Sequence, residues 1–168
     1  MMTNKLEGLV IITLILVIFS LNNDEKEEYY YNSEIPEDYY VRSDTNWGNL
    51  GYYGLERLVQ NGFVTPYQED KFDCSEMSAY MEWYLEKYGF NASICTSQHF
   101  EGSKGHAWVR VDTKDGKVAY IEATAKNNLI RWEEDYSQPE RIYESIYEIR
   151  NVEEFDWWTT DLKNQGSN

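Results

Sequence analysis

Residues that build metal and redox sites are scarce in this sequence. Among its 168 residues there are only two cysteines, Cys74 and Cys95, and two histidines, His99 and His106. They form no Cys-x-x-Cys or His-x-x-x-His pair, and Cys95 and His99 lie in a segment whose pattern predicts a strand, where positions four apart are distant in space. We therefore expect no bound metal and no cofactor, with Cys95 as a buried apolar side chain and His99 as a loop residue.

Basic side chains are also few. The chain has 15 Lys and Arg against 30 Asp and Glu, which gives a formal net charge of -15 at pH 7. Phosphate backbones and anionic headgroups repel such a surface, so we expect no nucleic acid partner. The sequence also lacks internal repeats, a phosphate-binding glycine loop and a basic stripe, which disfavours nucleotide functions. Otherwise the acidic charge indicates only a solvated surface.

A long apolar run occurs at one place, LVIITLILVIFSL at residues 9–21. Its length is typical of a signal-peptide core or a short anchor, and it lacks a good small-x-small cleavage site and a lipobox cysteine. We expect residues 1–23 to be a membrane anchor or signal peptide, with an uncleaved anchor preferred. The rest of the chain is then membrane-anchored or secreted, outside the cytoplasm. The acidic, tyrosine-rich residues 24–45 predict a flexible tether.

The remaining sequence is long enough for one domain, and a hydrophobic content of 42% allows a packed core. We assign this domain to residues 46–150 and a C-terminal aromatic and acidic extension to residues 151–168. Within the extension, FDWW at 155–158 is expected to pin the tail onto the domain. The pattern of residues 139–149 fits a helix or a strand equally well.

The stretch KFDCSEMSAYMEWYLEKYGF at 71–90 predicts a helix that begins at Cys74. Its apolar residues recur at helical spacing, and Asp73 with Glu76 forms a capping-box pattern. A sulfur at a helix N-terminus lies near unpaired N–H groups and the positive end of the macrodipole, which favour a thiolate. Two other interpretations of Cys74 stay open. It is a small buried hydrophobe, or it forms a disulfide with Cys95, since disulfides are common outside the cytoplasm.

After the helix the pattern changes to alternation, which predicts strands at 92–97, 106–112 and 118–123. If residues 114–116 form a three-residue loop with Gly116 left-handed, Trp108 lies opposite Glu122. His106 and Glu122 are then diagonal neighbours on one face, close enough for the carboxylate to orient the imidazole. A two-residue loop would instead turn Glu122 to the other face.

In the three-residue register, the chain supplies a nucleophilic thiol at Cys74, a base at His106 and an orienting carboxylate at Glu122. These are the parts of a cysteine nucleophile that acts on acyl groups. Trp108 shares the face of His106 and is expected to wall the substrate cleft.

The sequence resembles the transglutaminase-like branch of the papain-type superfamily. The motifs that carry the resemblance are FDCSEMSAYMEWYLEKYGFNA at 72–92, GHAWVRV at 105–111 and VAYIEAT at 118–124. The resemblance implies an α+β fold, papain-like or transglutaminase-like, with the cysteine-bearing helix packed on a small antiparallel sheet. It also implies Cys74 as nucleophile, His106 as general base and acid, and Glu122 in a position that is more often aspartate. By analogy with papain-like enzymes, Gln68 is a candidate oxyanion donor.

The family contains transglutaminases, peptidases, amidases and domains without activity. The expected function is therefore cysteine-dependent acyl transfer, with hydrolysis of an amide, peptide or isopeptide bond preferred over transfer to an amine. The alternative is a catalytically inactive domain of this fold that binds a protein or a cell-surface polymer. The expected partners are a peptide, protein or cell-surface polymer substrate and, through the N-terminal segment, a membrane.

Overall fold

The structure is a computed structural model that describes residues 35–62, 67–101, 104–125, 130–131 and 134–160. The expected anchor or signal peptide at 1–23 and the first part of the expected tether lie outside the described residues. Within the described ranges, no helix has both the length and the apolar character needed to cross a membrane.

The helix that carries the cysteine, α3 (Cys74–Lys87), begins where the sequence predicts. Asp73 is the N-cap in extended conformation and accepts a hydrogen bond from the Ser75 N–H, while its own N–H donates to the Glu76 carboxylate at 3.0 Å. This reciprocal capping box satisfies N–H groups that a helix start otherwise leaves unpaired. A second helix, α2 (Gly51–Gly62), follows the short 3-10 helix η1 (Trp47–Leu50).

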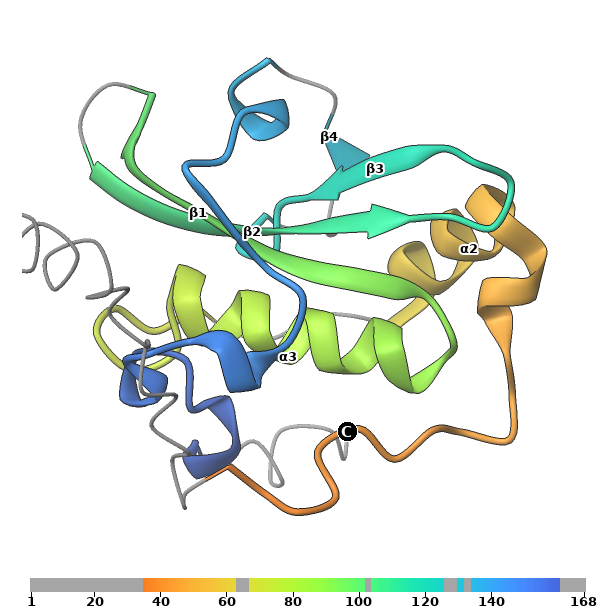
Figure 1. Cartoon of the computed structure of the whole chain (residues 1–168), viewed down its shortest axis with the longest axis horizontal. Helices are drawn as coiled ribbons and strands as arrows, with labels where there is room; N and C mark the ends of the chain where they lie inside the picture. Colours follow the sequence, from red (N-terminus) through yellow and green to blue (C-terminus); the bar gives the residue numbers. More distant parts are fainter. Residues whose placement is uncertain (1–34, 63–66, 102–103, 126–129, 132–133, 161–168) are drawn as a thin grey trace, which may run out of the picture. The chain divides into compact units, whose positions relative to one another are not determined.

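Five strands form one antiparallel sheet in the order β4-β3-β2-β1-β5. They are β1 (Asn91–Phe100), β2 (Lys104–Asp112), β3 (Val118–Ile121), β4 (Ile130–Arg131) and β5 (Arg141–Tyr143). The three strands predicted from alternation are confirmed as β1, β2 and β3. Figure 1 shows α3 lying along one face of this sheet. The domain is therefore α+β, with the cysteine-bearing helix packed on a small antiparallel sheet.

The turn between β2 and β3 has the three-residue form that places His106 and Glu122 on one face in the predicted register. Thr113 N–H donates to Lys117 O at 2.8 Å, and Gly116 has a φ of 78°, in the left-handed region that favours glycine. Val109 pairs with Ile121, and the ladder continues in that register to Asp112. The predicted register is confirmed, and it directs Glu122 to the same face as His106.

The two faces of β2 pack against different parts of the chain. Val109 and Val111 join Met77, Met81 and other α3 residues in the main core. On the opposite face Trp108 packs with Tyr136, which belongs to the short 3-10 helix η2 (Asp135–Ser137). Because both faces are covered, β2 is a central strand with little solvent contact.

Both flanks of the expected domain also pack onto it. Tyr39 is 2% exposed, and its hydroxyl donates to the Ala79 carbonyl of α3 at 2.9 Å. Residues 35–45, expected as the end of a flexible tether, thus lie against the domain because buried acceptors on α3 receive the Tyr39 and Tyr40 hydroxyls.

The aromatic residues of the C-terminal segment anchor it to α3, as expected. The ring centroids of Trp157 and Tyr80 lie 4.7 Å apart, and the Trp157 indole N–H donates to the Tyr39 hydroxyl at 3.1 Å. The segment 139–149, whose pattern fitted helix or strand, forms β5 and the single-turn η3 (Ile146–Glu148). Described residues on both sides of the expected domain, before residue 46 and after residue 150, thus pack against α3.

Candidate active site

Cys74 is the first residue of α3, half-buried and free of any disulfide. Cys95 is also free, and it lies fully buried in β1 with Trp108 and Tyr136 as neighbours. Burial raises the pKa of the Cys95 thiol to about 12. The described structure therefore holds one thiol that opens to a cavity and one that is sealed in the core.

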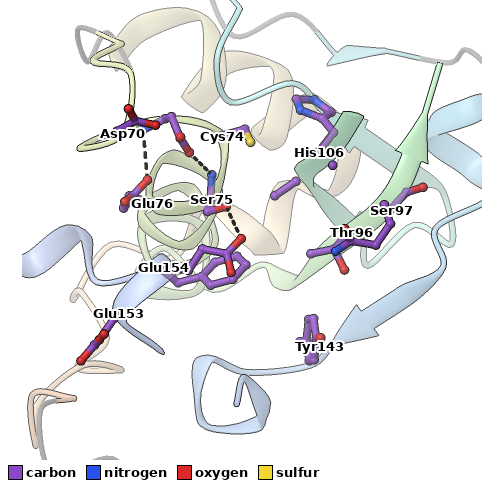
Figure 2. A pocket seen from close by; sticks show the side chains of 15 residues that line it. Asp70, Cys74, Ser75, Glu76, Thr96, Ser97, His106, Tyr143, Glu153 and Glu154 are labelled. Atoms are coloured by element: carbon purple, nitrogen blue, oxygen red, sulfur yellow. Dashed lines mark hydrogen bonds between the residues drawn. The ribbon is translucent and has the colours of Figure 1, made fainter. Parts of the chain in front are cut away.

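His106 lies at the beginning of β2, and Figure 2 shows the Cys74 sulfur and the His106 ring facing each other. The ring nitrogen Nε2 lies 2.7 Å from Glu122 Oε2, and the His106 side chain is 17% exposed. Phe100 and Trp108 flank the ring at centroid distances of 4.6 and 6.0 Å. The imidazole is thus held between Cys74 and Glu122 by a carboxylate and two aromatic rings.

The charges of this site stabilise each other. Burial would lower the pKa of His106, but hydrogen bonding to Cys74 and Glu122, together with their negative charge, outweighs it and raises the pKa to about 9. Burial would likewise raise the pKa of Glu122, but hydrogen bonds from His106, Thr124 and Tyr136 and the charge of His106 lower it to about 2. At neutral pH the site therefore contains an imidazolium and a carboxylate.

Cys74 and His106 open into one cavity of about 500 Å³. One of its sides is formed by β1 and β2 residues and the other by the start of α3 and the segment that precedes η5 (Trp157–Thr159). Five of the fifteen lining residues carry a carboxylate, and Figure 2 shows most of these on the α3 side of the cavity. They are Asp70, Asp73, Glu76, Glu153 and Glu154.

The first turn of α3 offers a backbone donor beside the sulfur. Ser75 N–H donates to Asp73 Oδ1 at 3.1 Å, and Glu76 N–H is taken by the same capping carboxylate. The N–H of Cys74 has no acceptor among the described residues. An N–H at this position can bind an oxyanion that forms next to the Cys74 sulfur.

Two other residues predicted for the site lie elsewhere. Gln68 pairs with Phe72 in an isolated bridge and lines a neighbouring pocket of about 340 Å³, not the cavity of Cys74 and His106. Trp108 is fully buried, and its indole N–H donates to the Tyr136 carbonyl at 3.0 Å. It supports the His106 ring from within the core and does not wall the cavity, because η2 covers its face of β2.

His99, expected to be a loop residue, lies in β1. The His99 ring is exposed at the far end of β1 and lies 2.9 Å from Glu140. In the part of the chain that the structure describes, no group of His, Cys, Asp and Glu is arranged to hold a metal ion.

Some site residues escaped the sequence analysis. Tyr136 contacts Glu122 from a segment that no motif marks, and Glu154 accepts a hydrogen bond from Ser75 across 79 positions of sequence. Thr124, two residues after Glu122, was quoted in a motif but given no role. Threonine favours hydrogen bonds to groups close in sequence, and Thr124 is only two residues from Glu122. This spacing could have indicated its contact with the carboxylate.

Comparison with known proteins gives one curated relative of note. It is the uncharacterized protein MJ0834 of Methanocaldococcus jannaschii, to which the chain is 30% identical over 109 residues, 62% of this chain and 46% of that protein. The chain thus spans about half the length of this relative. No protein-family model matches the chain, and no solved structure matches it.

Proposed function

We propose that this domain is a transglutaminase-like, papain-type cysteine enzyme that hydrolyses an amide, peptide or isopeptide bond. The observation that carries the proposal is the position of the His106 ring. It lies 2.7 Å from Glu122 on one side and faces the free Cys74 on the other, at the wall of a cavity large enough for a side chain and its amide.

In the first step the Cys74 thiol gives its proton to His106, and Sγ attacks the carbonyl carbon of the scissile amide, so that a C–S bond forms as the carbonyl electrons move to oxygen. The N–H of Cys74 binds this oxyanion at the start of α3. When the intermediate collapses, the C–N bond breaks and the His106 imidazolium gives its proton to the leaving amine. Glu122 holds the ring in place and stabilises its positive charge.

In the second step water attacks the thioester, His106 takes its proton, and the Cys74 sulfur leaves. The carboxylates around the cavity favour water over an amine as the acceptor. They stabilise the ammonium form of any bound amine and so raise its pKa, and an ammonium group is not a nucleophile. Hydrolysis is therefore preferred over transfer.

The apolar run at residues 9–21 supports a location outside the cytoplasm, either anchored in a membrane or secreted. The substrate class proposed with it is a peptide, a protein or a cell-surface polymer that contains amide links.

Iodoacetamide alkylation of the full-length chain tests the proposal. Mass spectrometry follows Cys74 and the buried Cys95 separately, in wild type and in His106→Ala, from pH 5 to 9. We expect Cys74 to react at pH 6 at least tenfold faster in wild type than in the variant, while Cys95 stays unmodified in both. Cys74→Ser should abolish hydrolysis in a screen of fluorogenic peptide and isopeptide amides.

Equal, slow alkylation of Cys74 in both proteins would show that the thiol is a structural part of the helix start. The inactive binding domain would then be the better description of the protein.

A further inference from the structure

The carboxylate of Glu122 has a neighbour that comes from outside the motifs of the triad. Tyr136 lies in η2, on the sheet face opposite α3, and its hydroxyl donates to Glu122 Oε2 at 2.7 Å. We infer that Tyr136 is a positioning residue of this site, which holds the Glu122 carboxylate in the one orientation that fixes the His106 ring toward Cys74. The inference rests on the proposed function for its catalytic meaning, but its geometry can be tested separately.

The hydrogen bonds of Glu122 are fully used. Oε2 accepts from His106 Nε2 and from the Tyr136 hydroxyl, both at 2.7 Å. Oε1 accepts from the Thr124 N–H at 3.0 Å and from the Thr124 hydroxyl at 2.5 Å. An ionised carboxylate has about four acceptor positions, so every one of them is occupied. If Thr124 alone held the group, Oε2 could still swing about Oε1, and Tyr136 prevents that movement.

Glutamate needs such a restraint more than an aspartate would. Its side chain has one more rotatable bond, which costs more conformational entropy when a single orientation is required. Glu122 is only 6% exposed, so an Oε2 that moved away from its donors would be a buried anion without full pairing.

Tyr136 is itself fixed, as a positioning group must be. It is 4% exposed, and its carbonyl accepts the Trp108 indole N–H at 3.0 Å. Its ring packs edge-on against Phe100 and Trp108, at centroid distances of 4.9 and 5.7 Å. Trp108 and His106 lie on the same face of β2 two residues apart, so one strand anchors both the imidazole and the tyrosine that restrains its carboxylate.

The chain offers a matched control for the purely structural role of such a hydroxyl. Tyr40 donates to Glu82 Oε1 at 2.7 Å, and Glu82 is fully buried in α3 but does not line the cavity of Cys74. Tyr136→Phe and Tyr40→Phe each remove a hydroxyl donor 2.7 Å from a buried glutamate, and Tyr40→Phe also removes the acceptor of the Ile146 N–H. Both should lower the midpoint of thermal unfolding, but only the first should affect His106 and Cys74.

The test uses the full-length chain and two readouts. Proton-detected NMR of the imidazole ring follows the titration of His106, which faces Cys74 of α3, Glu122 after β3 and Tyr136 of η2. Iodoacetamide is the probe for Cys74 at pH 6. We expect Tyr136→Phe to lower the His106 titration midpoint by at least half a unit and to slow Cys74 alkylation at least fivefold. Tyr40→Phe should leave both at wild-type values.

The inference is overturned if the His106 midpoint in Tyr136→Phe equals that of wild type, or if Tyr40→Phe lowers it equally. Failure of the proposed function has a different signature. In that case Cys74 of wild type reacts as slowly as in His106→Ala, while the shift of the His106 midpoint in Tyr136→Phe still reports on the geometry. If Tyr136→Phe does not fold, Trp108→Phe, which removes the indole donor that fixes Tyr136, should lower the midpoint in the same direction. An unchanged midpoint in that variant then also overturns the inference.

Discussion

Replacing Glu122 with glutamine removes one negative charge from the candidate active site while keeping nearly the same shape. The glutamine oxygen can still accept from Thr124, so the local fold should persist. His106 loses its charged partner at 2.7 Å, and its pKa should fall from about 9 toward the ordinary value of 6.5.

The size of this change follows from the shift in His106. A rise from 6.5 to about 9 corresponds to roughly 3 kcal/mol of stabilisation of the imidazolium, shared between Cys74 and Glu122. Because burial alone would lower the pKa, removal of the carboxylate should destabilise the imidazolium by at least ~1.4 kcal/mol. This corresponds to a fall of about one pH unit in the His106 titration midpoint.

The same pair makes stability depend on pH with a definite sign. The raised pKa of His106 contributes stability that is complete below about 6.5 and is lost as pH rises through about 9. The lowered pKa of Glu122 contributes stability that is complete above about 4.5 and is lost as pH falls toward about 2. The pair should therefore stabilise the fold fully between about pH 4.5 and 6.5. Glu122→Gln should weaken the pH dependence of the free energy of unfolding on both sides of this window.

The assay is NMR of the two imidazole rings across pH 5 to 10, with the exposed ring of His99, whose carboxylate partner is Glu140, as the internal reference. A His106 midpoint that is the same in wild type and Glu122→Gln would refute the electrostatic reasoning, because the carboxylate would then contribute nothing to the charge on the ring.

Three further predictions concern the framework. Burial raises the pKa of Glu82 to about 8 despite the hydrogen bond from Tyr40, so its contribution to stability is complete below about pH 4.5 and is lost as pH rises through about 8. Urea unfolding should show wild type losing on the order of 5 kcal/mol relative to Glu82→Gln across that window, and parallel curves would contradict this. A Cβ on Gly48 would lie 1.9 Å from the Gly89 carbonyl oxygen, so Gly48→Ala should lower the free energy of unfolding by about 3 kcal/mol. Urea unfolding measures this loss, and an unchanged free energy of unfolding would contradict the close approach. Asp73→Ala removes the N-cap of α3 and should cost about 1 kcal/mol. It should also slow Cys74 alkylation, whereas an unchanged rate would mean that the cap does not position the thiol.

The parts of the fold that could be predicted depend on signals close together in the sequence. The beginning of α3 follows from Asp73 and Glu76, three residues apart, and the β2–β3 register follows from the glycine of a short turn. Both signals are local, so they do not depend on the rest of the chain. That register places His106 and Glu122 on one face as diagonal neighbours, within reach of each other.

The remaining parts depend on contacts between distant segments. Alternation along β2 could not show which face is covered, because η2 packs over Trp108 and buries a side that the pattern left open. Tyr39 lies in an acidic, tyrosine-rich stretch whose composition favours a tether, yet a carbonyl and a carboxyl group of α3 provide acceptors for it. No local pattern encodes such partners, and this also explains why Tyr136 was missed.

The order in which the candidate active site assembles follows from the short turn of the β2–β3 hairpin. His106 and Glu122 are 16 positions apart and joined through that turn, so they can meet early in folding at a small cost in loop closure. Cys74 belongs to a helix that must dock on the finished sheet before its sulfur faces the ring. The proposed base and its carboxylate should therefore be in place before Cys74 arrives, so the proposed active site is complete only when folding is almost finished.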